Sequence, residues 1–144
     1  MVGALAVGCS GGSSGRLTVN PPSPAGQVAT VCGALHDALP RRLDGRPATP
    51  VSPKSALTAA WGDPAVVLRC GVGKPAELLP TSETIDVNDV RWFFHETKDA
   101  YIFTTYGRAA FVEVRVPKSV PREQATAPLV DLARPVLDSV PVAE

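Results

Sequence analysis

Two histidines, each followed directly by a carboxylate, are the residues of this chain best suited to acid–base chemistry. They are His36, which precedes Asp37, and His95, which precedes Glu96. A positioned histidine can carry a proton in hydrolysis or group transfer. If residues 90–97 form a strand, however, His95 and Glu96 point to opposite faces and cannot act together directly. The histidines therefore support only an alternative hypothesis, a small envelope hydrolase or transferase that uses His95 or His36 with a carboxylate.

Other signatures of catalysis, cofactors and nucleic-acid binding are weak. The pattern Gly-x-Ser-x-Gly occurs only in the Ser/Gly-rich segment at residues 8–15, which no predicted strand and helix flank, so it does not indicate a nucleophile elbow. Its two histidines are far apart in the sequence, and two of its cysteines are expected to form a disulfide with each other, so these residues do not make a zinc ligand set. The 14 basic and 14 acidic side chains balance, whereas a nucleic-acid binder needs a basic surplus. We therefore expect no metal, no cofactor and no nucleic-acid partner, and we favour a non-catalytic binding module over an enzyme.

Cys9 ends a wholly apolar segment of small residues, and a polar Ser/Gly spacer follows it. This pattern is typical of the end of a bacterial lipoprotein leader, in which the cysteine sulfur carries the lipid. A positively charged region is missing ahead of the apolar segment, so we expect the true leader to begin upstream. The sequence thus predicts lipidation of Cys9. The alternative is a disordered N-terminal tail with a free thiol.

Cys32 and Cys70 are each predicted to face the core. Ser23 and Pro24 are a helix-start signal, and Pro40 ends the helix predicted over residues 27–39. Apolar residues recur there at helical spacing, and Cys32 is among them. In the strand predicted over residues 65–72, Cys70 shares a face with other apolar residues. We therefore expect a Cys32–Cys70 disulfide, which leaves Cys9 as the one cysteine outside the bond. The alternative is a pair of buried free thiols in a reducing cytosol.

Residues 90–116 are expected to form an antiparallel meander of three strands, at 90–97, 100–106 and 109–116. Lys98 with Asp99, and Gly107 with Arg108, suit two-residue turns. Pairing through these turns defines two faces. The apolar face, a predicted core, holds Val90, Trp92, Phe94, Tyr101, Phe103, Val112, Val114 and Val116.

The opposite face of this meander mixes aromatic rings with charges, which is typical of a recognition surface. The candidate binding face comprises Arg69, Arg91, Phe93, His95, Phe111, Glu113 and Arg115, with Ile102 and Thr104 between them. The alternative is that proline-rich loops fold over the face and hide its aromatic rings.

The expected architecture is α+β: an antiparallel four- to five-stranded meander sheet with an N-terminal and a C-terminal helix packed on one face, stapled by the disulfide. Pro135 is expected to kink or split the second helix, over residues 128–140. Residues 41–54 and 73–89 are proline-rich and are expected to be irregular. Residues 1–9 are a leader remnant, 10–22 a flexible linker and 23–144 a single domain.

Several stretches resemble a known family, and the segment from Trp61 to Cys70 is the most specific of them. The others lie at residues 87–92, 103–108 and 112–117, together with Cys32 ahead of Leu39 and Pro40. Over about residues 20–140 the chain resembles the actinobacterial family catalogued as domain of unknown function 3515. The resemblance implies a secreted or membrane-anchored envelope protein and supplies no catalytic residues. We therefore expect an extracytoplasmic module, anchored through Cys9 or secreted, that binds an envelope protein, a wall component or a small ligand.

Overall fold

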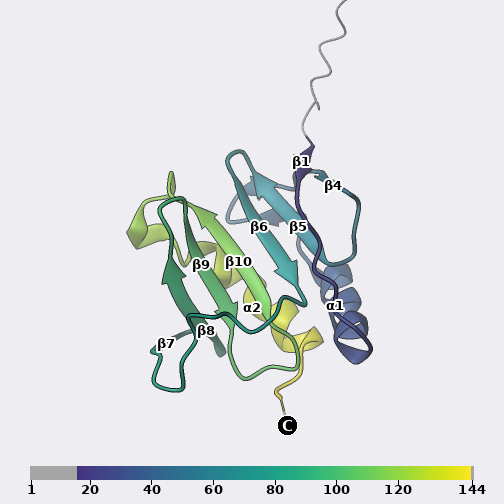
Figure 1. Cartoon of the computed structure of the whole chain (residues 1–144). Helices are drawn as coiled ribbons and strands as arrows, with labels where there is room; N and C mark the ends of the chain where they lie inside the picture. The colour runs from purple at the N-terminus through teal and green to yellow at the C-terminus, as the bar shows by residue number, and fades with distance from the viewer. Residues whose placement is uncertain (1–15, 144) are drawn as a thin grey trace, which may run out of the picture.

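The computed structural model describes residues 16–143, so Cys9 and the predicted leader lie outside the described residues. Two helices and ten strands are arranged along this range as shown in Figure 1. The elements are β1 (Leu17–Thr18), α1 (Gln27–Ala38), β2 (Arg42–Leu43), β3 (Arg46–Pro47), β4 (Val51–Ser52), β5 (Thr58–Gly62), β6 (Ala65–Cys70), β7 (Thr84–Val87), β8 (Val90–Glu96), β9 (Ala100–Thr105), β10 (Val112–Pro117), a 3-10 turn (Arg122–Gln124) and α2 (Ala127–Ser139).

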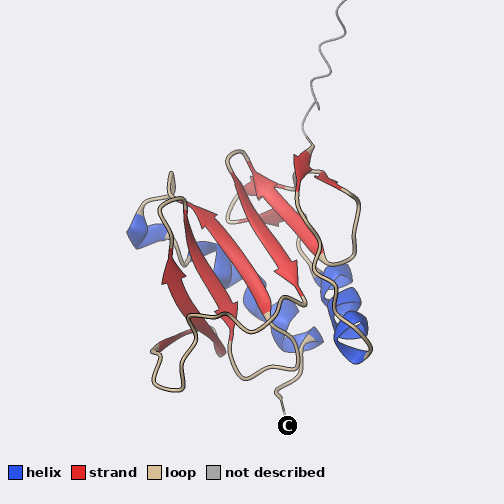
Figure 2. Cartoon of the chain, in the orientation of Figure 1, coloured by secondary structure: helices blue, strands red, loops and turns tan. Residues whose placement is uncertain are grey.

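The main sheet is antiparallel and has six strands in the order β5-β6-β10-β9-β8-β7, with both helices on one face (Figure 2). The predicted α+β class is therefore confirmed, but the predicted count of four to five strands is wrong. Only β7 to β10 form a meander, because β6 pairs with β10 rather than with β7. The small pairs β1-β4 and β2-β3 lie outside this sheet.

Within the main sheet, β5 and β7 are the strands that the sequence did not predict. β7 falls in the stretch 73–89 that was expected to be irregular, and it forms a hairpin with β8. The two turn residues, Asn88 and Asp89, have φ of 47° and 71°, the left-handed backbone that a tight hairpin turn requires. Asn followed by Asp signals such a turn more weakly than Asn followed by Gly, so the hairpin is difficult to predict.

The two faces of the meander are as predicted, although one turn differs. The Lys98–Asp99 turn is confirmed, since Thr97 N donates to Ala100 O over 2.9 Å. The second connection is longer than the predicted two-residue turn, and β10 begins at Val112. Thr105 closes it by donating to Ala110 O and accepting from Val112 N. This shifts the β9–β10 register by two residues, so every side chain keeps its predicted face.

The core lies between the inner face of the sheet and the two helices. All eight residues of the predicted apolar face belong to it, and only Phe94 is half-buried. The helices contribute Val31, Cys32, Leu35, Leu129, Leu132, Ala133 and Val136.

α1 begins at Gln27, three residues after the predicted start signal at Ser23 and Pro24. Gly26 precedes it with φ of 60°. Pro24 packs against Gly71 instead, and a Cβ on that glycine would lie 2.6 Å from the proline ring. The predicted disulfide between Cys32 and Cys70 is present, with both residues buried and their Cα atoms 5.6 Å apart. It joins α1 to β6.

α2 is a single helix across Pro135, so the predicted split does not occur. Proline at this position removes one helical hydrogen bond, the one to the carbonyl of Asp131. Its ring is buried in the core, and this burial offsets the loss. No helix within residues 16–143 is long and apolar enough to cross a membrane.

β1 lies inside the segment 10–22 that the sequence predicts to be a flexible linker. It pairs in parallel with β4, with Leu17 opposite Val51 and Thr18 opposite Ser52. Val19 follows and is buried. Residues 17–19 are therefore held to the rest of the domain, and residues 10–15 lie outside the described range.

Candidate functional site

The outer sheet face brings most of the predicted binding residues together in two rows. One row runs across the sheet from Phe93 through Glu113 to Arg69. The next row contains His95 and Arg115 on either side of Ile102. Arg91 lies on the same strand as Phe93 and His95, outside these two rows and opposite Asp86 of β7. Phe111 precedes β10 and belongs to neither row.

Much of this outer face is covered or internally paired. Phe93 and Ile102 are only 5% and 4% exposed, as expected if loops cover the face. The β6–β7 connection crosses the side opposite the helices (Figure 1), and its Leu78 is buried. Arg69 and Glu113 form an ion pair with each other over 3.4 Å. The use of this face for recognition stays a prediction.

His95 and Glu96 lie on opposite faces of β8, so the adjacent pair does not form a catalytic unit. His95 stacks on Phe93 with the ring centroids 5.5 Å apart. Its Nδ1 is buried without a hydrogen-bond partner among residues 16–143. Glu96 accepts hydrogen bonds from Lys118 and Arg122, which lower the pKa of its carboxyl.

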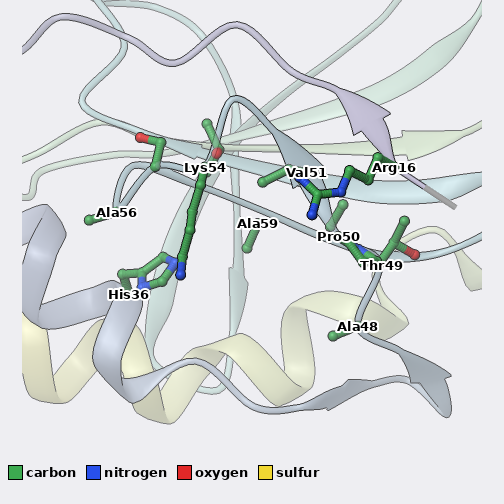
Figure 3. Close-up of a pocket in the computed structure, with 12 residues that line it drawn as sticks. Arg16, His36, Ala48, Thr49, Pro50, Val51, Lys54, Ala56 and Ala59 are labelled. Carbon is green, nitrogen blue, oxygen red and sulfur yellow. The ribbon is translucent and has the colours of Figure 1, made fainter. Parts of the chain in front are cut away.

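His36 lines a cavity of about 590 Å³ at the β5 edge of the sheet, shown in Figure 3. We call it the cationic cavity. α1 supplies His36, and the segments on either side of β4, with β5 itself, supply most of the wall. The lining residues are Arg16, His36, Ala48, Thr49, Pro50, Val51, Lys54, Ser55, Ala56, Thr58, Ala59 and Ala60.

The charged residues that line this cavity are all basic or imidazole groups. Lys54 and His36 point toward one another, and Arg16 lies on the other side of the cavity (Figure 3). None of the three forms an ion pair with another residue of the described chain. Arg16 and Lys54 are exposed and His36 is half-buried. This arrangement can attract and hold an anion.

Three hydroxyl-bearing residues line the same cavity. Thr49 Oγ1 donates to Gly62 O over 2.8 Å, and Ser55 Oγ accepts from Leu57 N over 3.0 Å. Thr58 is 1% exposed, and its Oγ1 has no hydrogen-bond partner within residues 16–143. A buried hydroxyl without a partner is costly. Because this hydroxyl oxygen is also shielded from solvent, it offers no direct contact to a ligand in the cavity.

A second cavity of about 600 Å³ adjoins the first and shares Arg16, Ala48, Thr49 and Pro50 with it. Its other walls include Asp63 and Pro64. Trp61 is buried and its Nε1 donates to Pro40 O over 3.0 Å. The turn after it lines the second cavity.

The sequence did not single out Arg16 or Lys54. Arg16 falls in the predicted linker and Lys54 at the end of a predicted irregular stretch, where no periodicity locates a side chain. The parallel β1–β4 pair brings them to one place, because Leu17 lies opposite Val51. No group of three or more His, Cys, Asp or Glu side chains in the range 16–143 could hold a metal ion.

Comparison with known proteins identifies the family but no activity. A model of the family described as protein of unknown function (DUF3515) matches residues 5–144. No curated protein and no solved structure matches the chain. Because the match spans nearly the whole sequence, the chain belongs to this family, as the resemblance implied.

Proposed function

We propose that this DUF3515 family member is a non-catalytic module of the cell envelope that binds a small anionic ligand in its cationic cavity. In this proposal the module is held outside the membrane by a lipid on Cys9, or is secreted. The observation that carries the proposal is that Arg16, His36 and Lys54 all line one cavity. None of the residues that line this cavity carries a carboxylate, and Asp63 lines only the adjoining second cavity.

The Cys32–Cys70 disulfide supports the extracytoplasmic part of the proposal. Structural disulfides form and persist in oxidising compartments and are rare in a reducing cytosol. This one is buried, so it is suited to a structural role rather than to exchange with small thiols. Cys9 is then the remaining cysteine, available for a lipid.

The surroundings of the histidines support binding rather than catalysis. A catalytic histidine commonly works with a nucleophile and with a carboxylate that orients it. His36 lines a cavity in which the other charged lining residues are Arg16 and Lys54. His95 stacks on Phe93, and Glu96 lies on the other face. Replacing His95 by alanine, with His36 kept because it lines the cavity, should leave the function in cells intact. Loss of function without loss of folded protein would favour the enzyme alternative.

Binding is tested by titrating the full chain with inorganic phosphate, sulfate and citrate and measuring heat or chemical-shift changes. The test variant is Arg16→Gln/Lys54→Gln. Its control is Lys74→Gln/Lys98→Gln, which removes the same charge from two exposed lysines without ion pairs among the described residues. Wild type and control should bind alike and the test variant at least tenfold more weakly. Equal binding by all three proteins would reject the cavity as the site.

The compartment is tested separately by the intact mass of the protein from native cells, with and without reduction before thiol alkylation. A lipid on Cys9, with Cys32 and Cys70 blocked until reduction, is the expected result. Three free thiols on an unmodified chain would place the protein in the cytosol and contradict this part of the proposal.

A further inference from the structure

We infer that the ligand of the cationic cavity is a phosphate ester, supplied by the anionic headgroups of the membrane to which the chain is tethered. The inference rests on the proposed function and specifies its ligand. Three features support it: the donors that line the cavity, its size and apolar walls, and its place in the chain relative to Cys9.

The donors that line the cavity suit a phosphate better than a carboxylate. The two oxygens of a carboxylate lie in one plane, whereas the charged oxygens of a lipid phosphate are arranged on a tetrahedral phosphorus that donors can approach from several sides. Arg16 presents a guanidinium fork, Lys54 an ammonium and His36 an imidazole. Arginine and lysine are the usual protein ligands of phosphate groups.

The size of the cavity indicates an occupant larger than a free inorganic anion. Cavities of about 590 Å³ and 600 Å³ adjoin at shared residues, and each is in the range that holds an organic ligand. Small apolar side chains form much of the first wall, among them Ala48, Pro50, Val51, Ala56 and Ala59. Such walls pack well against the glycerol and first methylene groups beside a lipid phosphate.

The place of the cavity in the chain indicates the source of the phosphate. Arg16 lines the cavity and is only seven residues after Cys9. Seven residues span at most about 25 Å however they are arranged. A lipid on Cys9 therefore keeps Arg16 within that distance of the bilayer surface, and Figure 1 shows β1 and β4 at the end of the domain where the chain enters. Anionic headgroups attract basic residues that are held this close.

The test uses the full chain with Cys9→Ala, so that no lipid anchor contributes to membrane binding. Co-sedimentation is measured with vesicles of phosphatidylglycerol mixed with phosphatidylcholine, and with phosphatidylcholine alone. Glycerol 3-phosphate is titrated in parallel. We expect binding to the anionic vesicles only. Adding Arg16→Gln/Lys54→Gln should weaken it at least tenfold, whereas Lys74→Gln/Lys98→Gln should change it about twofold or less.

The vesicle and glycerol 3-phosphate experiments distinguish a membrane headgroup from a soluble phosphate ester as the source of the phosphate. Glycerol 3-phosphate binding as tightly as the vesicles would show a soluble phosphate ester as the ligand and overturn the membrane assignment. Equal losses in the two double variants would show that only net charge matters, and would overturn the cavity's role. Binding of citrate or sulfate without binding of vesicles or glycerol 3-phosphate would reject this inference and leave the proposed function standing. Unchanged melting temperatures verify that each variant is folded.

Discussion

Basic side chains gather at two opposite edges of the main sheet, and their surroundings differ. Near the end of β8, Lys118 and Arg122 both bond Glu96, and they also lie over the rings of Tyr101 and Phe94, at 4.4 Å and 5.8 Å from the ring centroids. At the β5 edge, the cations of the cationic cavity form no ion pair within residues 16–143.

The difference separates cations that stabilise the fold from cations that are free for a ligand. Lys118 and Arg122 already have an anion from the same chain, so an external anion would have to compete with Glu96. Arg16 and Lys54 have no such competitor among the described residues, and an arriving anion displaces only water. Both groups consist of lysine and arginine, so residue type does not distinguish them. They differ in whether a carboxylate of the described chain forms an ion pair with them.

The largest expected effect comes from the disulfide, because it holds α1, and with it His36, against β6. The Cys32→Ala/Cys70→Ala variant should lose about 4 kcal/mol of unfolding free energy, the entropic value for the 38-residue separation of the cysteines. Denaturant unfolding measures this loss, and reduced wild type should approach the variant. Anion affinity should fall as well. A variant as stable as the oxidised protein would contradict the structural role of the bond.

The second-largest effect is expected when a carboxylate is introduced beside the unpaired cations of the cationic cavity. This substitution tests the comparison between paired and unpaired cations directly. Ala56 is exposed and lines the cationic cavity, so Ala56→Glu should weaken anion binding at least tenfold with little change in melting temperature. Ala76→Glu is the control, since it makes the same substitution at an exposed alanine in the β6–β7 connection. Calorimetric titration measures both. Equal binding by the two variants would mean that an internal anion does not block the cavity.

A smaller effect on stability is expected near the end of β8, where Lys118 and Arg122 are paired with Glu96. Hydrogen bonds from Lys118 and Arg122 hold the pKa of Glu96 below its ordinary 4.5. A lowered pKa in the folded state means that the stabilisation is present above about pH 4.5 and is lost as the pH falls through the folded value. Glu96→Gln should thus reduce the melting temperature slightly at neutral pH and converge with wild type in acid. The group is exposed, so the change is small.

The control at this edge is Glu123→Gln, which removes a neighbouring exposed carboxylate that has no ion pair among residues 16–143. Its melting temperature should follow wild type at every pH. If Glu123→Gln reproduced the profile of Glu96→Gln, general surface charge rather than the Lys118 and Arg122 contacts would account for the effect.

The smallest effect on anion binding is expected from the outer sheet face. Arg91 and Arg115 do not line the cationic cavity, so Arg91→Glu/Arg115→Glu should leave anion affinity and melting temperature nearly unchanged. The same variant tests the predicted recognition face, because it should abolish capture of any protein partner that binds there. Pull-down with a crosslinked envelope fraction measures the second outcome. Retained capture would remove this face as a binding surface.

Long periodic segments made much of the fold predictable. The helix ending at Pro40, the inward positions of Cys32 and Cys70, and both faces of the meander follow from apolar spacing. The face assignment held even where the turn after β9 differed, because a shift of two residues keeps each side chain on its side. Gly107 was recognised as a turn residue, but the side-chain bonds of Thr105 that lengthen the turn leave no periodic signal.

The rest depended on contacts between short segments that are distant in the sequence. β5 and β7 are short edge strands in proline-rich surroundings, and β1 and β4 have two residues each. Arg16, His36 and Lys54 line one cavity only because these short pieces pair. The candidate site on the outer face was visible as a pattern. The cationic cavity was not, since none of its cations stands within a motif.

The N-terminal segment also has a mechanical consequence if the chain is tethered at Cys9 and the part of the domain that follows Cys70 is pulled away from the tether. Tension then acts first on β1, which is held to the domain by Leu17 N–Pro50 O and Val19 N–Ser52 O hydrogen bonds of 2.9 and 3.0 Å. Peeling can proceed through residues 16–31 and reaches a covalent stop at Cys32. The loop closed by the disulfide is shielded from the pull, and the load passes directly to β6 inside the sheet. Because Arg16 and Pro50 both line the cavity, the first step of that peeling would also open the site and release its occupant under load.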